Sequence, residues 1–165
     1  MIHRILKVAD RAGLVGSASA HCDIPCGIYD TGPAIIAAVS VVRLMDIMHD
    51  ASSDDAVALA NVRTRCVLRK EDEAEKVKQE IRVIWGDYFK PALQEKHPEV
   101  NALVHKIMMK ASACKQDVHR EDGLALVELV NEFAELFWKT KSVETVRKTC
   151  PYPPKLKVVY PVLAE

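Results

Sequence analysis

Apolar residues recur along most of the chain at the three- and four-residue spacing of amphipathic helices. The spacing predicts helices over residues 33–49, 54–85, 98–114 and 120–141. Polar or proline-containing breaks separate them, such as Asp50–Asp55 and the Lys90–Pro91 step. No alternating pattern typical of strands lies between the helices. The sequence therefore predicts an all-α fold, an up-and-down four-helix bundle.

The two ends of the chain differ from this helical middle. Residues 1–20 end in the small residues Ser17-Ala18-Ser19-Ala20 and lack the long apolar block of a secretory signal. We interpret them as a pro-segment with an accessible cleavage site. Residues 142–165 are rich in proline, which cannot continue a helix. This tail is expected to be extended, and to lie along the body or cross to a neighbouring subunit.

Composition narrows the class of function. The 165 residues carry 23 Lys+Arg and 23 Asp+Glu, so the formal net charge is zero. A nucleic-acid-binding protein needs an excess of basic side chains to neutralise phosphates, and this balance argues against a nucleic-acid partner. Charged residues interrupt every long apolar segment, which argues against a membrane partner.

The five cysteines are odd in number and widely scattered, which is not typical of a secreted disulfide framework. Their thiols are therefore expected to be reduced or metal-bound. Cys66 and Cys114 fall on predicted helices and are expected to be small core residues. Cys150, beside Pro151, is expected to be an exposed thiol.

The chemically informative residues occupy nine positions, His21-Cys22-Asp23-Ile24-Pro25-Cys26-Gly27-Ile28-Tyr29. From the residues alone, Cys22 and Cys26 could form a local disulfide or join a zinc site, although zinc needs further Cys or His ligands at motif spacing. Pro25 lies between the two cysteines and can bend the backbone sharply, most naturally through a cis Ile24–Pro25 bond. Gly27 would relieve crowding as the chain leaves the loop.

This segment resembles the nickel hook of the nickel-containing superoxide dismutases, whose signature His-Cys-x-x-Pro-Cys-Gly-x-Tyr it matches at every fixed position. Residues 85–91 are similar to the family's aromatic turn between its second and third helices, and residues 137–141 to the end of its last helix. The resemblance implies a domain over 21–141, with the hook at 21–29 and the helices at 33–141. It implies an enzyme that disproportionates superoxide to dioxygen and hydrogen peroxide by cycling nickel between divalent and trivalent states.

In this family the hook supplies the metal ligands. Carried over to this chain, the thiolates of Cys22 and Cys26, the amide nitrogen of Cys22 and the α-amine of His21 would hold one nickel ion per subunit. The His21 imidazole would be the axial ligand of the oxidised state. Electron-rich donors of this kind suit square-planar nickel. The α-amine exists only once the Ala20–His21 bond has been cut, so the resemblance implies a precursor that is processed.

The resemblance also gives roles to residues around the hook. Tyr29 and Tyr88 match two tyrosines near the nickel that would narrow the approach, order water and position the small anion, while Asp23 would shape the hook. Restricted access matters because peroxide would otherwise oxidise the thiolates. One feature departs from the family: a glutamate that steadies the axial histidine is Ala37 here, and Glu73 stands near the place of its arginine partner. Changes around metal ligands can cost about 10–100-fold in activity or affinity.

The resemblance extends to partners and location. The family assembles as a hexamer, so a homohexamer is implied, together with a separate protease that removes the pro-segment. A cytoplasmic location is expected from the family, with export left open by the weakly signal-like N-terminus. One alternative function also stays open, a carrier or sensor that binds nickel or copper through the same hook without catalysis. The departures at Ala37 and Glu73 support that alternative.

Overall fold

The structure is a computed structural model that describes residues 26–163. The chain is mostly helical, as predicted. Its elements are, in order, α2 (Gly32–Asp50), α3 (Ala56–Val83), the π-helical turn η1 (Ile84–Tyr88), α4 (Pro91–Lys96), α5 (Glu99–Gln116), α6 (Arg120–Thr140), β1 (Thr145–Thr149) and β2 (Lys157–Pro161). We call the helices from α2 to α6, with η1, the helical body.

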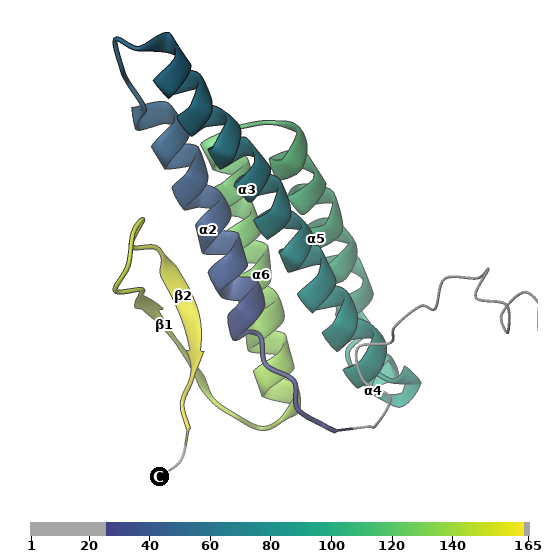
Figure 1. Ribbon diagram of the computed structural model, residues 1–165. Helices are drawn as coiled ribbons and strands as arrows, with labels where there is room; N and C mark the ends of the chain where they lie inside the picture. Colours follow the sequence, from purple (N-terminus) through teal and green to yellow (C-terminus); the bar gives the residue numbers. More distant parts are fainter. Residues whose placement is uncertain (1–25, 164–165) are drawn as a thin grey trace, which may run out of the picture.

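The four long helices lie side by side, and successive ones run in opposite directions (Figure 1). The contacts between them join α2 to α3, α3 to α5, α5 to α6 and α6 back to α2. Each helix turns an apolar face to the shared interior. The largest fully buried apolar side chains in this interior are Val39, Val41, Val42, Met45, Val77, Ile81, Phe89, Ile107, Leu126, Phe133 and Phe137.

Helix α2 is long and apolar enough to cross a membrane by length and composition alone. Half of its apolar window is buried inside the protein, against its neighbours α3 and α6. Packing in the helical body therefore accounts for the buried half of this window.

Local start signals are present at the beginning of two of the long helices. The Asp55 side chain accepts hydrogen bonds from the backbone amides of Val57 (2.9 Å) and Ala58 (3.2 Å), which have no partner inside the helix, and so starts α3. Pro33 occupies the first turn of α2, where a missing amide hydrogen costs nothing. The observed bounds of the four long helices lie within a few residues of those predicted.

The connection between α3 and α5 contains more structure than the sequence predicts. The end of α3 widens into η1, which carries Tyr88, and the Phe89 amide closes this turn by donating to the Ile84 carbonyl at 3.2 Å. Pro91 then starts the short helix α4, which the sequence analysis did not predict. Phe89 is buried beneath this turn and anchors it to the core.

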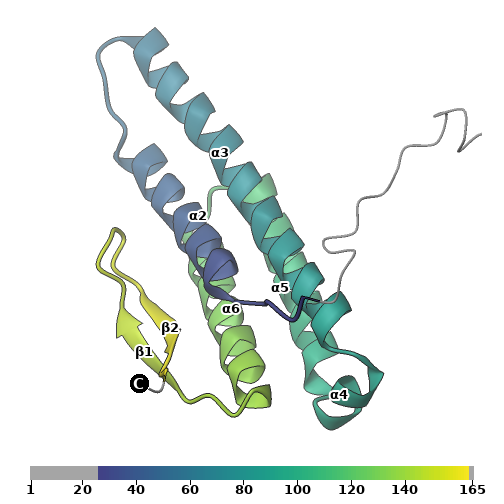
Figure 2. The ribbon, with the colours of Figure 1, turned by 60° about the horizontal axis from the view of Figure 1, so that its bottom comes forward.

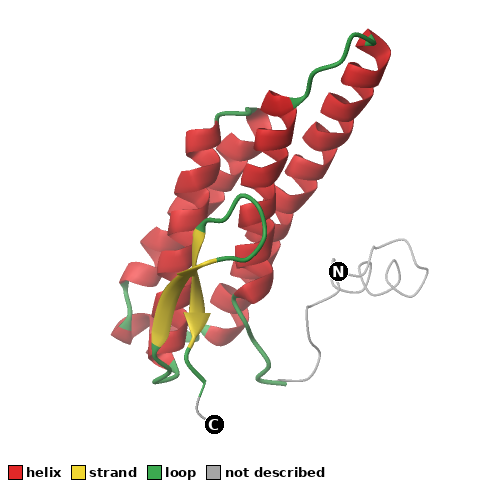
Figure 3. Ribbon diagram, turned by 90° about the vertical axis from the view of Figure 1, so that its left-hand side faces the viewer, coloured by secondary structure: helices red, strands yellow, loops and turns green. Residues whose placement is uncertain are grey.

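The tail corrects the all-α prediction, because it forms an antiparallel hairpin in which Thr145 pairs with Pro161 and Thr149 with Lys157 (Figure 3). The tail is extended and lies along the helical body, which was one of the two expected arrangements, but it also pairs with itself. The side chain of Asn131 on α6, itself fully buried, binds the outer edge of β2. It donates to the Lys157 carbonyl at 3.0 Å and accepts from the Val159 amide at 3.1 Å.

Cys150, at the end of β1, is also a correction. It was expected to be exposed, and it is only 1% exposed. Its thiol donates to the Tyr152 carbonyl at 3.3 Å, across the turn that joins the strands. The hairpin covers this side chain, and a burial that depends on how the tail folds back is not visible in local sequence.

Candidate metal centre

Residues 26–31 lead from the candidate hook into α2. Figure 2 shows this segment crossing the end of the helical body, from the side of α4 to the first turn of α2. Cys26 is exposed there, whereas the other three cysteines among residues 26–163 are buried. The remaining sequence-predicted hook residues and the cleavage site, Ala20, His21, Cys22, Asp23 and Pro25, lie outside the described residues.

Gly27 adopts a left-handed backbone conformation, with φ of 69°. No described atom beyond the adjacent residues comes within 4 Å of the position that a Cβ would occupy there. The expected relief of crowding is therefore not visible among the described residues. Glycine is favoured because its backbone reaches positive φ at little cost.

The two candidate tyrosines meet across this end of the helical body. Tyr29 comes from the segment that follows Cys26, and Tyr88 from η1, which lies 59 residues further along the chain. Their ring centroids are 5.8 Å apart at an interplanar angle of 55°. Both rings are half-buried. The structure thus brings together two of the residues that the sequence analysis placed near the metal.

Aromatic packing holds the Tyr88 ring from the core side. Its centroid lies 5.3 Å from that of Phe89 and 5.0 Å from that of Phe137, both in edge-to-face geometry. Phe89 and Phe137 are buried, and Phe89 continues to Phe133 at 5.9 Å. Edge-to-face pairs of this kind add about 0.5–1.5 kcal/mol each to burial, so the Tyr88 ring has a well-defined position.

Two polar residues at the end of α6 contact Tyr88. The Tyr88 hydroxyl lies 2.7 Å from Thr140 Oγ1, and Thr140 Oγ1 donates to the Phe137 carbonyl at 2.6 Å. The Lys141 ammonium lies 4.9 Å from the centroid of the Tyr88 ring. Residues 137–141 were predicted only as a helix end, and neither Thr140 nor Lys141 had a predicted role. Their contact with Tyr88 spans 52 residues for Thr140, and no local spacing reveals it.

Positions 37 and 73, which depart from the family pattern, do not reproduce the family's glutamate–arginine pair. Ala37 is fully buried and has no side-chain atom that can accept a hydrogen bond from an imidazole. Glu73 is buried on α3, and its carboxylate pairs with Arg69 Nη2 at 2.8 Å on the same helix. An acidic side chain therefore stands at 73 with its own local partner, and a methyl group stands at 37.

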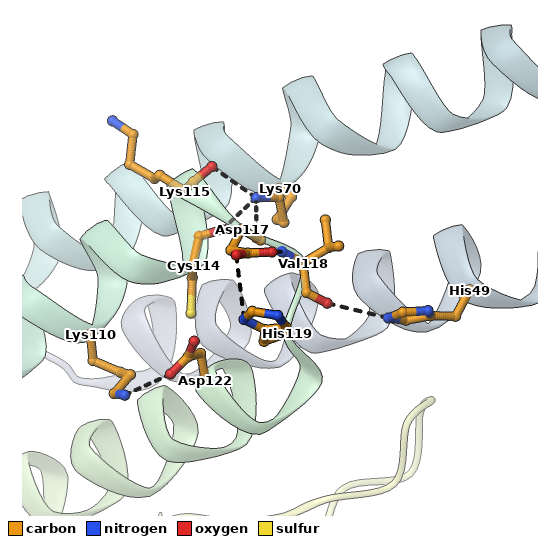
Figure 4. Close-up of polar contacts among 9 residues, drawn as sticks. All are labelled: His49, Lys70, Lys110, Cys114, Lys115, Asp117, Val118, His119 and Asp122. Atoms are coloured by element: carbon orange, nitrogen blue, oxygen red, sulfur yellow. Dashed lines mark hydrogen bonds and ion pairs between the residues drawn. The ribbon is translucent and has the colours of Figure 1, made fainter.

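A second polar cluster lies at the far end of the helical body, around the connection between α5 and α6 (Figure 4). Lys70, only 1% exposed, donates to the carbonyls of Cys114, Lys115 (2.9 Å) and Asp117 (2.8 Å). Burial lowers the pKa of the Lys70 ammonium. Burial, followed by the charge of Asp122, raises the pKa of the Cys114 thiol to about 11. This thiol is protonated at neutral pH and is a poor metal ligand.

Among residues 26–163, no three His, Cys, Asp or Glu side chains gather in a way that could hold a metal ion. The donor set that fits a metal is the hook, in which Cys26 is an exposed thiol at the end of the helical body and the other donors precede it. Thiolate, amide and amine donors suit nickel better than the oxygen-preferring metals. The residues present therefore fit a nickel ion.

The family model and the relatives that match this chain all point to one family. Residues 16–141 match the family model described as nickel-containing superoxide dismutase. The chain is 38% identical over 123 residues to superoxide dismutase [Ni] of Streptomyces coelicolor, and 37% identical over 123 residues to that of Streptomyces seoulensis. Each match covers 74% of this chain and 89% of the relative.

Solved structures of nickel superoxide dismutase are also similar. A native structure superposes with a TM-score of 0.66 at 36% identity, covering 73% of this chain and 99% of that one. A structure with nickel ligation of the oxidised state gives 0.67 at 34% identity, covering 74% and 99%. The family match ends at residue 141, directly after α6, so the C-terminal hairpin lies beyond it.

Proposed function

Because this chain belongs to the nickel-containing superoxide dismutase family, we propose that it converts two superoxide anions and two protons to dioxygen and hydrogen peroxide. The observation that carries the proposal is the continuity between motif and structure. The nine-residue hook lies within the matched residues, and the ring of its last residue, Tyr29, packs beside that of Tyr88.

The hook residues are proposed to hold one nickel ion per subunit. Cys22 would contribute its thiolate and amide nitrogen, Cys26 its thiolate, and His21 its α-amine and imidazole. When bound, the nickel ion supplies one-electron chemistry between its divalent and trivalent states. The α-amine of His21 requires cleavage after Ala20, so the active form is the processed chain.

The described residues contribute access and charge. The ring centroids of Tyr29, the last residue of the hook, and Tyr88 lie 5.8 Å apart, and the two rings would limit what reaches the hook to small molecules. Limited access protects the hook thiolates from oxidation by the peroxide product. Lys141, beside Tyr88, adds a positive charge that favours approach of the superoxide anion.

We infer the wider organisation from family membership and from the arrangement of the helices. The helical body is assigned to the up-and-down four-helix bundles, with an N-terminal hook and with residues 1–20 as a pro-segment. The subunit is proposed to form a homohexamer and to depend on a separate processing protease. A cytoplasmic location is proposed, with export before cleavage as the alternative.

A second candidate function, a nickel or copper carrier or sensor, is favoured by one specific observation. Ala37 offers no hydrogen-bond acceptor and Glu73 is paired with Arg69, so neither position reproduces the glutamate–arginine support of the axial histidine. If that support is essential for turnover, the hook would bind metal without catalysis. Both functions allow one bound nickel ion per subunit, but only the dismutase consumes superoxide.

Native mass spectrometry of protein purified from its own source, followed by a superoxide consumption assay, tests the proposal. A chain that begins at His21, carries one nickel ion and consumes superoxide supports it. Cys22→Ser and Cys26→Ser should then lose activity, while the matched control Cys66→Ala, on α3, should keep it. A chain with nickel and no turnover would favour the carrier, and a stable chain beginning at Met1 without nickel would overturn the dismutase function.

A further inference from the structure

We propose that Thr140 is a positioning residue that fixes the direction of the Tyr88 hydroxyl, so that Tyr88 presents a hydrogen-bond acceptor, and not a proton donor, to the metal centre. The relevance of this arrangement to catalysis rests on the proposed function. The arrangement itself rests on two contacts of Thr140 Oγ1, with the Tyr88 hydroxyl at 2.7 Å and with the Phe137 carbonyl at 2.6 Å.

Counting hydrogens gives the direction of both contacts. Two oxygen atoms this close need a hydrogen between them. The Phe137 carbonyl can only accept, so the hydrogen in that contact belongs to Thr140. A threonine hydroxyl has a single hydrogen. The hydrogen in the second contact therefore belongs to Tyr88, which donates to Thr140.

The end of α6 explains why the Thr140 hydrogen is committed to Phe137. In a continuing α-helix, the amide of Lys141 would donate to the carbonyl four residues earlier, that of Phe137. Here the Lys141 amide donates to the Trp138 carbonyl at 3.0 Å, because the last turn tightens. The Thr140 hydroxyl serves the Phe137 carbonyl in place of that amide, so turning it towards Tyr88 would cost a helix-end hydrogen bond.

With its hydrogen directed to Thr140, the Tyr88 oxygen has only lone pairs left to offer to any further group. Phe89 and Phe137 pack against the ring and Lys141 lies over its face, so the ring itself has a fixed position. The remaining freedom is rotation of the hydroxyl hydrogen about the C–O bond, and Thr140 removes it. Tyr88 can then accept a hydrogen bond from a water molecule or from hydrogen peroxide. The protons of the reaction must come from another group.

Ultraviolet resonance Raman spectroscopy of the metal-free protein tests the direction. The tyrosine Fermi doublet distinguishes a donating from an accepting phenol, and the difference between wild type and Tyr88→Phe isolates Tyr88 from the other tyrosines. We expect a donor signature for Tyr88 in the wild type and in Thr140→Ser, and its loss in the near-isosteric Thr140→Val. An acceptor signature in the wild type would overturn the proposal, and circular dichroism verifies that the Tyr88→Phe reference is folded.

Activity provides a separate arm with the processed, nickel-loaded protein. We expect Thr140→Val to lower the rate of superoxide consumption by up to about 10-fold at neutral pH and to shift its pH profile. Thr140→Ser should keep most of the wild-type rate. In the Tyr88→Phe background, Thr140→Val should have no further effect. An additional loss there would overturn the positioning role. If the wild type consumes no superoxide but shows the donor signature, the proposed function fails while the positioning contact stands.

Discussion

The two ends of the helical body differ in how deeply their polar groups are buried. At the far end, the buried ammonium of Lys70 is surrounded by three backbone carbonyls of the α5–α6 connection (Figure 4). At the hook end, Cys26 is exposed, and the half-buried Tyr88 packs its ring on aromatic side chains while its hydroxyl contacts Thr140. Lys70 donates to backbone carbonyls of the fold, whereas Tyr88 lies beside Tyr29 at the candidate metal centre.

This difference shows that an altered pKa does not by itself mark a functional site. Burial lowers the pKa of Lys70 and raises that of Cys114 to about 11, yet both side chains lie at the far end of the body. The partners of Lys70 are carbonyls without intrahelical donors at the end of α5, so its role is that of a cap. Substitutions at the two ends should therefore separate activity from stability.

The largest effect is expected from Cys26→Ser. Loss of a thiolate ligand should lower superoxide consumption at least about 100-fold, because the trivalent state of nickel depends on electron-rich sulfur donors. The thiol is exposed, so the free energy of unfolding of the metal-free protein should stay within about 0.5 kcal/mol of wild type. Urea unfolding and the superoxide assay measure the two quantities. A large loss of stability with activity retained would show that Cys26 supports the fold and is not a metal ligand.

The next effect is expected from Lys70→Met, which removes the hydrogen bonds to three carbonyls while keeping most of the side-chain volume. We expect a loss of about 3 kcal/mol in the free energy of unfolding. The rate of superoxide consumption per folded, nickel-loaded chain should be unchanged. Lys76→Met, an exposed lysine on the same helix, is the matched control and should be nearly neutral. Equal effects of the two variants would refute the capping role.

A smaller effect is expected from pH through Cys114. Its pKa is raised from the usual value of 9.0 to about 11 in the folded protein, so the unfolded chain loses the proton first as the pH rises. The contribution of the protonated thiol is fully present below about pH 9 and is lost between pH 9 and 11, by about 2–3 kcal/mol. Cys114→Ala should remove this part of the pH dependence in urea unfolding. An unchanged slope would show that Cys114 does not titrate in this range.

The four long helices were predictable because their apolar spacing and start signals are local. Asp55 caps α3 and Pro33 begins α2 within the same few residues that mark them in the sequence. The hook was visible for a similar reason, since the family's signature residues occupy nine adjacent positions. Local patterns of this kind need no knowledge of how distant segments meet.

The features that were missed depend on distant contacts. The tail becomes a hairpin because β2 binds Asn131 on α6 and closes over Cys150, and no residue within the tail indicates either contact. Helix α4 is six residues long, too short for a periodic pattern to appear. The contact of Tyr88 with Thr140 joins residues 52 positions apart. The hairpin and the contact of Tyr88 with Thr140 are determined by packing between elements, whereas α4 was missed because of its length.

The smallest expected effect concerns the charge at the hook end. Lys141 lies 4.9 Å from the Tyr88 ring centroid, where its charge is placed to attract an anion to the site. Lys141→Gln should lower the rate about 2- to 5-fold at low salt and weaken its dependence on ionic strength, because less of the attraction remains to be screened. Lys139→Gln removes the same charge from an exposed position two residues earlier and should change the rate less. If both variants lower the rate equally, net charge and not the position above Tyr88 accounts for the attraction.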